Sequence, residues 1–87
     1  MDHPHSAIAR RLKRANGHLE TIIEMIEKGR PCAQIAQQLQ AVESAIESAK
    51  KALIHDHISH SLEQSLKSTG SKEQAAPRDF KLIAKYL

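Results

Sequence analysis

The chain has 87 residues, enough for one small domain, and only 2% of them are aromatic. Because large core-filling side chains are nearly absent, we expect much of the apolar surface to be buried between subunits. No apolar run approaches the ~18 residues of a membrane span, no signal peptide precedes the first predicted helix, and a single cysteine excludes an intrachain disulfide framework. These exclusions favour a cytoplasmic protein. The net charge of +3 slightly favours binding to polyanions. Six histidines are unusual in so short a chain.

The first predicted helix spans about residues 6–28 and follows a polar arm over residues 1–5. Ser6 is its predicted N-cap, and Gly29 followed by Pro31 predicts its end. Its apolar residues are spaced at steps of 4, 3, 4, 3 and 4, which is a heptad seam. The seam consists of Ile8, Leu12, Ala15, Leu19, Ile22 and Ile26.

The second predicted helix spans about residues 31–68, with Pro31 at its first position and no further glycine before Gly70. Its seam repeats the same steps and consists of Ile35, Leu39, Val42, Ile46, Ala49 and Leu53. A polar linker follows. Pro77 then opens a short third helix over about 77–86, whose apolar side consists of Phe80, Ile83, Ala84 and Leu87.

These patterns predict an all-α fold in which residues 1–87 form a single domain. Two heptad helices joined by a tight turn make a helical hairpin, and two hairpins make an antiparallel four-helix bundle. Both seams are therefore expected to be core.

Cys32 and two histidines are the candidate metal ligands. Cys32 lies in the first turn of the second helix, where unpaired N–H groups favour the thiolate that binds metals, although a lone cysteine is equally well a small buried apolar residue. His57 and His60 are i, i+3 neighbours that share a helix face, whereas His55 points elsewhere; such histidines are also common as solvated surface.

Cys32 and His57 cannot meet within one chain if the helix is straight. They are 25 residues apart, which is about 37 Å of helix, whereas metal ligands lie within a few Å of each other. Two long helices packed antiparallel would bring Cys32 of one chain beside His57 of its partner and create two equivalent sites per dimer. The predicted metal site therefore requires a homo-oligomer.

The N-terminus offers a further set of nitrogen donors. The amine of Met1, the following amides and the imidazole of His3 can surround a square-planar ion, the geometry that Cu(II) and Ni(II) prefer. The alternative is a flexible arm that happens to carry histidine.

Basic residues are concentrated in the first helix. Glu20, Glu24 and Glu27 gather at the far end of that helix, so the cations are not balanced locally. This asymmetry favours phosphate contacts with double-stranded DNA over a merely solvated face, although no standard DNA-reading motif is present. The candidate DNA-binding residues are Arg10, Arg11, Lys13, Arg14, Lys50 and Lys51.

Four motifs in order make residues 6–67 similar to the CsoR/RcnR/FrmR repressor family. They are Arg14-Ala15-Asn16-Gly17, Gly29-Arg30-Pro31-Cys32, Ala36-Gln37-Gln38-Leu39-Gln40-Ala41-Val42 and Asp56-His57-Ile58-Ser59-His60. The resemblance implies a cytoplasmic bacterial repressor whose all-helical dimers pair into disc-like tetramers. It also implies release of operator DNA when copper, nickel, cobalt or formaldehyde is sensed.

The resemblance assigns roles to individual positions. The sensing cysteine of the family matches Cys32, its histidine matches His57, and its basic position in the first helix matches Arg14. The donor four residues after the histidine is Cys in copper sensors and His in nickel/cobalt sensors, and it matches Ser61, a poor ligand for soft metals. His60 or His3 would supply the missing donor.

The leading hypothesis is a metal-responsive repressor, with nickel or cobalt ahead of copper. One alternative is a formaldehyde-responsive repressor that reacts at Cys32, although Asp2 stands where formaldehyde sensors carry a proline-type amine. Another is a metal-binding bundle without a DNA role. An enzyme is not expected, because no acid–base pair occurs at helical spacing beyond the ligand set.

Overall fold

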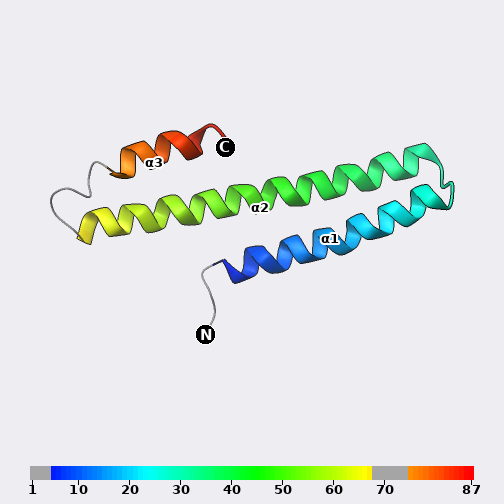
Figure 1. Ribbon diagram of the computed structural model, residues 1–87, viewed down its shortest axis with the longest axis horizontal. Coiled ribbons are helices and arrows are strands. Elements are labelled where there is room, and N and C mark those ends of the chain that lie inside the picture. The colour runs from blue at the N-terminus through cyan, green and yellow to red at the C-terminus, as the bar shows by residue number, and fades with distance from the viewer. Residues whose placement is uncertain (1–4, 68–74) are drawn as a thin grey trace. The chain divides into compact units, whose positions relative to one another are not determined.

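The computed structural model describes residues 5–67 and 75–87, and within these ranges every regular element is a helix (Figure 1). The helices are α1 (Ser6–Glu27), α2 (Cys32–Lys67) and α3 (Ala75–Ala84). The predicted all-α class is confirmed. Most of the predicted arm and linker, residues 1–4 and 68–74, lies outside the described residues.

The N-cap of α1 lies one residue before the predicted one. The carbonyl oxygen of His5 already accepts a hydrogen bond from the amide of Ala9 at 2.9 Å, so His5 is the N-cap and Ser6 is the first helical residue. The prediction of Ser6 as the N-cap was therefore wrong. No side chain caps this end of the helix.

The end of α1 is a complete Schellman motif, as the glycine and proline predicted. The amide of Arg30 donates to the carbonyl of Met25 at 2.9 Å, and the amide of Gly29 donates to the carbonyl of Ile26 at 3.1 Å. Gly29 adopts a φ of 71°, a left-handed conformation that a side chain disfavours.

Helix α2 begins at Cys32, immediately after Pro31. The carbonyl of Pro31 accepts hydrogen bonds from the amides of Gln34 and Ile35, at 3.0 and 3.2 Å. Pro31 is thus the N-cap and Cys32 takes the first helical position, one residue later than the sequence predicted. Cys32 therefore belongs to the first turn of α2, where the backbone amides have no partner within the helix.

The chain divides into two compact units, whose described parts are residues 5–49 in the first and residues 50–67 and 75–87 in the second. In the first unit, α1 and the first half of α2 run antiparallel as a hairpin (Figure 1). Its buried core contains residues spaced seven apart on each helix. These are Ile8, Ala15 and Ile22 on α1, and Val42 and Ala49 on α2.

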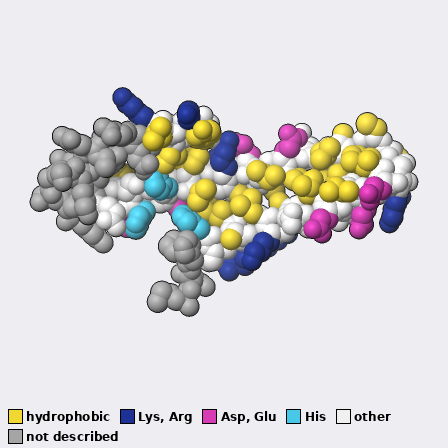
Figure 2. Space-filling view, in the orientation of Figure 1, with side chains coloured by type: hydrophobic (Ala, Val, Ile, Leu, Met, Phe, Trp, Pro, Cys, Tyr) yellow, Lys and Arg dark blue, Asp and Glu magenta, His cyan; other side chains and the backbone are white. Residues whose placement is uncertain are grey.

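The other half of each seam is not buried. Leu12 and Leu19 are 43% and 38% exposed on α1, and Leu39 and Ile46 are 39% and 47% exposed on α2. The single hairpin therefore buries only part of each seam, and the predicted core shared by two hairpins stays a prediction. A two-helix hairpin has one internal contact line, and it takes one of the two apolar positions in each heptad. Figure 2 shows apolar side chains in a band along the hairpin.

The second unit comprises the rest of α2 and α3. Ile54 is buried, while Phe80 and Leu87 are 49% and 61% exposed, so the predicted apolar side of the third helix is only partly covered. Helix α3 opens at Ala75, two residues before the predicted start, and Pro77 lies within its first turn, where a missing N–H is tolerated.

None of the described helices is both long enough and apolar enough to cross a lipid bilayer.

Candidate functional site: metal donors and a basic helix face

Cys32 is a free, exposed thiol at the first position of α2. The guanidinium of Arg30, in the turn just before it, donates a hydrogen bond to the side-chain oxygen of Gln34 at 3.2 Å. The reading of Cys32 as a buried apolar residue is excluded within the single chain.

The predicted histidine ligands lie in the second unit. His57 is half-buried and His60 is exposed, with its Nε2 atom 3.4 Å from the amide nitrogen of Gln64. His55 has 81% of its side chain exposed and lies 3.9 Å from a carboxylate oxygen of Asp56. Ser61 is half-buried.

The single chain does not assemble these donors into a site. Over residues 5–67 and 75–87, no three His, Cys, Asp or Glu side chains are close enough together to hold a metal ion. Met1 and His3, the predicted N-terminal donors, lie outside the described residues.

The predicted DNA-binding cations of α1 form an exposed cluster. Arg10, Arg11, Lys13 and Arg14 are all exposed, and the helix contains no carboxylate before Glu20. Figure 2 shows Lys and Arg side chains gathered along an edge of the hairpin, with Asp and Glu side chains nearer its turn. Neither Arg11 nor Arg14 has an ion-pair partner among the residues that the structure describes.

The two remaining predicted cations have a different setting. Lys50 is half-buried and Lys51 is exposed, and both belong to the second unit. Each already takes part in an interaction with its surroundings.

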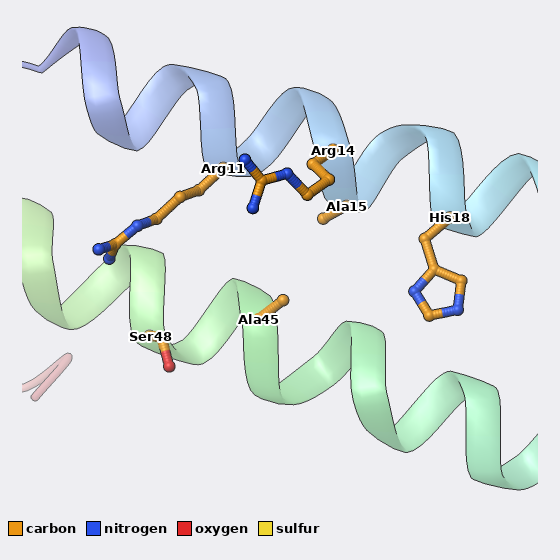
Figure 3. Close-up of a pocket in the computed structure, with 6 residues that line it drawn as sticks. All are labelled: Arg11, Arg14, Ala15, His18, Ala45 and Ser48. Carbon is orange, nitrogen blue, oxygen red and sulfur yellow. The ribbon is translucent and has the colours of Figure 1, made fainter.

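An open cleft of about 470 Å³ lies between α1 and α2 in the first unit (Figure 3). Its lining residues are Arg11, Arg14, Ala15, His18, Ala45 and Ser48. The Nε2 atom of His18 is 2.6 Å from the side-chain oxygen of Gln38 across the hairpin. Sequence reasoning overlooked His18, although its spacing from Arg11 and Arg14 already put all three on one face of α1.

Comparison with known proteins places these features in a family. The family model described as metal-sensitive transcriptional repressor matches residues 4–85. The copper-sensing transcriptional repressor CsoR of Mycobacterium ulcerans is 42% identical over 52 residues, which are 60% of this chain and 44% of the relative. CsoR of Bacillus subtilis is 34% identical over 79 residues, covering 91% of this chain and 77% of the relative. The copper-sensing repressor RicR of Mycobacterium tuberculosis is 34% identical over 62 residues, covering 71% and 65%.

The extent of these matches differs among the relatives. The chain spans less than half the length of the mycobacterial CsoR relatives that it matches, but most of the length of the Bacillus subtilis protein. No solved structure is significantly similar to the chain. The family model nevertheless covers nearly the whole sequence, and this confirms the resemblance drawn from the motifs. The chain therefore belongs to the family of metal-sensitive transcriptional repressors.

Proposed function

We propose that this protein is a homo-oligomeric repressor that binds operator DNA and releases it when a transition metal binds to Cys32 and His57. The observation that carries the proposal is the exposed thiol of Cys32 at the start of α2, in a member of a metal-sensitive repressor family. Because operator DNA is where such a protein acts, we also propose a cytoplasmic location.

The donor chemistry fits a transition metal. A thiol and imidazoles suit copper, nickel, cobalt or zinc, whereas magnesium and calcium prefer oxygen ligands. Cys32 supplies the sulfur, and His57, His60 and His3 are the proposed nitrogen donors. Because the described residues of one chain contain no group of three such donors, the proposal requires ligands from two chains.

The exposed apolar residues of the hairpin support a second copy of the chain as the partner. Leu12, Leu19, Leu39 and Ile46 leave the single hairpin with a row of unburied side chains. Two hairpins that pack these rows together make a four-helix bundle. In the proposed antiparallel arrangement, Cys32 of one chain lies near His57 of the other, and pairs of dimers form the tetramer.

The basic edge of α1 supports the DNA role. Arg10, Arg11, Lys13 and Arg14 are exposed and no carboxylate lies among them on the helix. Each cation that neutralises a DNA phosphate releases a condensed counterion, and this makes binding favourable at low salt. The oligomer would repeat the edge symmetrically, which suits an operator with an inverted repeat.

The proposal also ranks the candidate metals. The relatives are copper-sensing by name, so copper is included. A set with one sulfur and several nitrogens, and with serine at position 61, suits nickel or cobalt better than copper(I), which prefers soft ligands. We therefore keep nickel and cobalt ahead of copper and leave the decision to the titration.

The test begins with selection of bound sequences from a pool of random DNA duplexes. Fluorescence anisotropy then follows the complex while Cu(I), Ni(II), Co(II) or Zn(II) is added anaerobically. We expect one metal to weaken binding by about 5- to 150-fold, the range of a typical allosteric coupling. Cys32→Ser should bind the duplex as the wild type does but keep it when that metal is added.

Two outcomes overturn different parts of the proposal. If no duplex is enriched and none binds, the DNA role is wrong. If duplexes bind but no metal releases them, the metal response is wrong. Release that persists in Cys32→Ser would remove the thiol from the site.

A further inference from the structure

A row of exposed residues follows α2 at intervals of seven, starting from its first residue. Helix α2 is continuous from Cys32 to Lys67. A spacing of seven returns to nearly the same side of an α-helix, and the drift of about 20° per heptad is removed when two helices supercoil around each other. This row, the α2 stripe, consists of Cys32, Leu39, Ile46, Leu53 and His60, and all five are exposed.

The hairpin does not use the α2 stripe for its own core. It buries Val42 and Ala49, which belong to a different row of α2. The three apolar members of the stripe are between 39% and 47% exposed. An apolar row with a metal donor at each end is therefore left for the second copy of the chain that the proposed function requires.

The α2 stripe is symmetric about Ile46. Cys32 lies 14 residues before Ile46 and His60 lies 14 residues after it, about 21 Å in each direction. In an antiparallel pair, a two-fold axis at Ile46 matches residues at equal distances on its two sides. Leu39 of one copy then packs on Leu53 of the other, so every apolar member of the stripe meets an apolar member. The same axis brings Cys32 of one copy level with His60 of the other.

We propose that His60 of one copy and Cys32 of the other bind the same transition metal ion, with His60 as the donor in place of Ser61. The inference rests on the proposed metal-sensing function and identifies which further residue completes its site. His57 precedes His60 by three residues on the same side of α2 and supplies another nitrogen. Each dimer then holds two equivalent sites, and neither copy holds one alone.

His60 is better placed than Ser61 for this role. Ser61 lies about 100° further around α2 and is half-buried within its own chain, whereas His60 is exposed. The Nε2 atom of His60 is 3.4 Å from the amide nitrogen of Gln64, and its Nδ1 atom has no hydrogen-bond partner among the described residues. A histidine held through one ring nitrogen presents the other to a metal.

The first test mixes two variants that each remove one ligand. Cys32→Ser and His60→Ala are refolded together from urea so that copies exchange, and binding of Ni(II) and Co(II) is measured by competition with a chelator, without DNA. In a mixed dimer, one site receives both Cys32 and His60, and the other site receives neither. The matched control is His55→Ala, at a histidine of α2 that lies off the stripe and has 81% of its side chain exposed.

We expect Cys32→Ser and His60→Ala each to bind the metal at least about tenfold more weakly than the wild type, whereas His55→Ala keeps the wild-type affinity. The mixture should regain that affinity in about a quarter of its sites, because about half of its dimers are mixed and each of these has one complete site. A mixture that binds no better than its components would overturn the shared site. Wild-type affinity in His60→Ala would overturn it as well.

The second test needs no metal and separates this inference from the proposed function. In His60→Cys, diamide oxidises Cys32 and the thiol introduced at position 60 to a disulfide, and the reagent takes up two electrons and two protons. Within one chain the two positions are about 42 Å of helix apart, so a disulfide between them joins two copies.

We expect His60→Cys to form this disulfide-linked dimer at least about tenfold faster than His55→Cys, because a disulfide requires Cα atoms within about 7 Å. Non-reducing electrophoresis gives the rates, and peptide mass spectrometry identifies the linked positions. Equal rates for the two variants would overturn the alignment of Cys32 with His60. If the cross-link forms but the wild type binds neither metal, the alignment holds and the proposed metal response has failed.

Discussion

His18 on α1 and Gln38 on α2 are joined across the hairpin by a part-buried hydrogen bond of 2.6 Å between Nε2 and Oε1. This contact lies at the edge of the arginine-lined cleft, and Gln38 follows Cys32 by six residues on α2. This polar contact joins the two helices beside the apolar residues that they bury. It also connects the helix that carries Cys32, the proposed metal ligand, to the helix that carries the basic edge.

Replacement of Gln38 by Leu should destabilise the protein by about 1 kcal/mol, because the ring nitrogen of His18 loses its partner in a partly buried place. Urea unfolding followed by circular dichroism, at one fixed protein concentration, measures the change. Gln37→Leu is the control, since Gln37 is exposed. Equal free energies of unfolding for the two variants would show that the hydrogen bond contributes nothing.

Replacement by alanine should lower the stability of the protein at one glycine, in the turn after α1, and raise it at another, inside α1. Gly29 has a φ of 71°, so Gly29→Ala should cost about 1 kcal/mol of left-handed strain. Gly17 lies inside α1 and a Cβ there would meet nothing within 4 Å, so Gly17→Ala should stabilise by about 0.5–1 kcal/mol. Thermal unfolding checks both, and a stabilising Gly29→Ala would contradict the Schellman geometry.

The helices were predictable because their signals are local. Heptad spacing indicates a helix without reference to distant residues, and Gly29 followed by Pro31 indicates a helix end in the same way. The division of each seam was not predictable from that spacing. Leu12 and Ala15 satisfy the pattern equally well, and only the position of the neighbouring helix decides that Ala15 is buried and Leu12 exposed.

The cleft depends on tertiary structure in the same way. Ala15 and Ala45 are 30 residues apart, and nothing in the sequence around either one indicates that they oppose each other. His18 was passed over because the histidines were judged by their spacing as metal ligands. Its place beside Arg11 and Arg14 was readable as a helix face, but its bond to Gln38 was not.

A charge on the exposed apolar row should dissociate the proposed oligomer. Ile46 is 47% exposed in the hairpin and would be buried against the second copy, so Ile46→Glu would bury an unpaired carboxylate at a cost of about 3–5 kcal/mol. Sedimentation equilibrium should show a shift toward monomer at concentrations where Gln37→Glu, at an exposed polar position, stays associated. An unchanged molecular mass for Ile46→Glu would exclude this row from the interface.

The last prediction concerns Ser61, the residue that separates this chain from the copper-sensor pattern. Ser61 follows His57 by four residues, so both lie on the same side of α2, and Ser61 is half-buried. Its hydroxyl is a poor ligand for soft ions, whereas a thiolate at the same position would bind copper(I) strongly.

Ser61→Cys should therefore raise the affinity for copper(I) by at least about tenfold, with a smaller effect on nickel(II), as measured by anaerobic competition with a copper(I) chelator. Ser59→Cys is the matched control, because it adds the same thiol two residues after His57, where the side chains do not face each other. A gain in Ser61→Cys alone would support His57 as a ligand and position 61 as part of the metal site. An equal gain in both variants would reflect an extra thiol anywhere on α2, and the assignment of position 61 to the metal site would then be wrong.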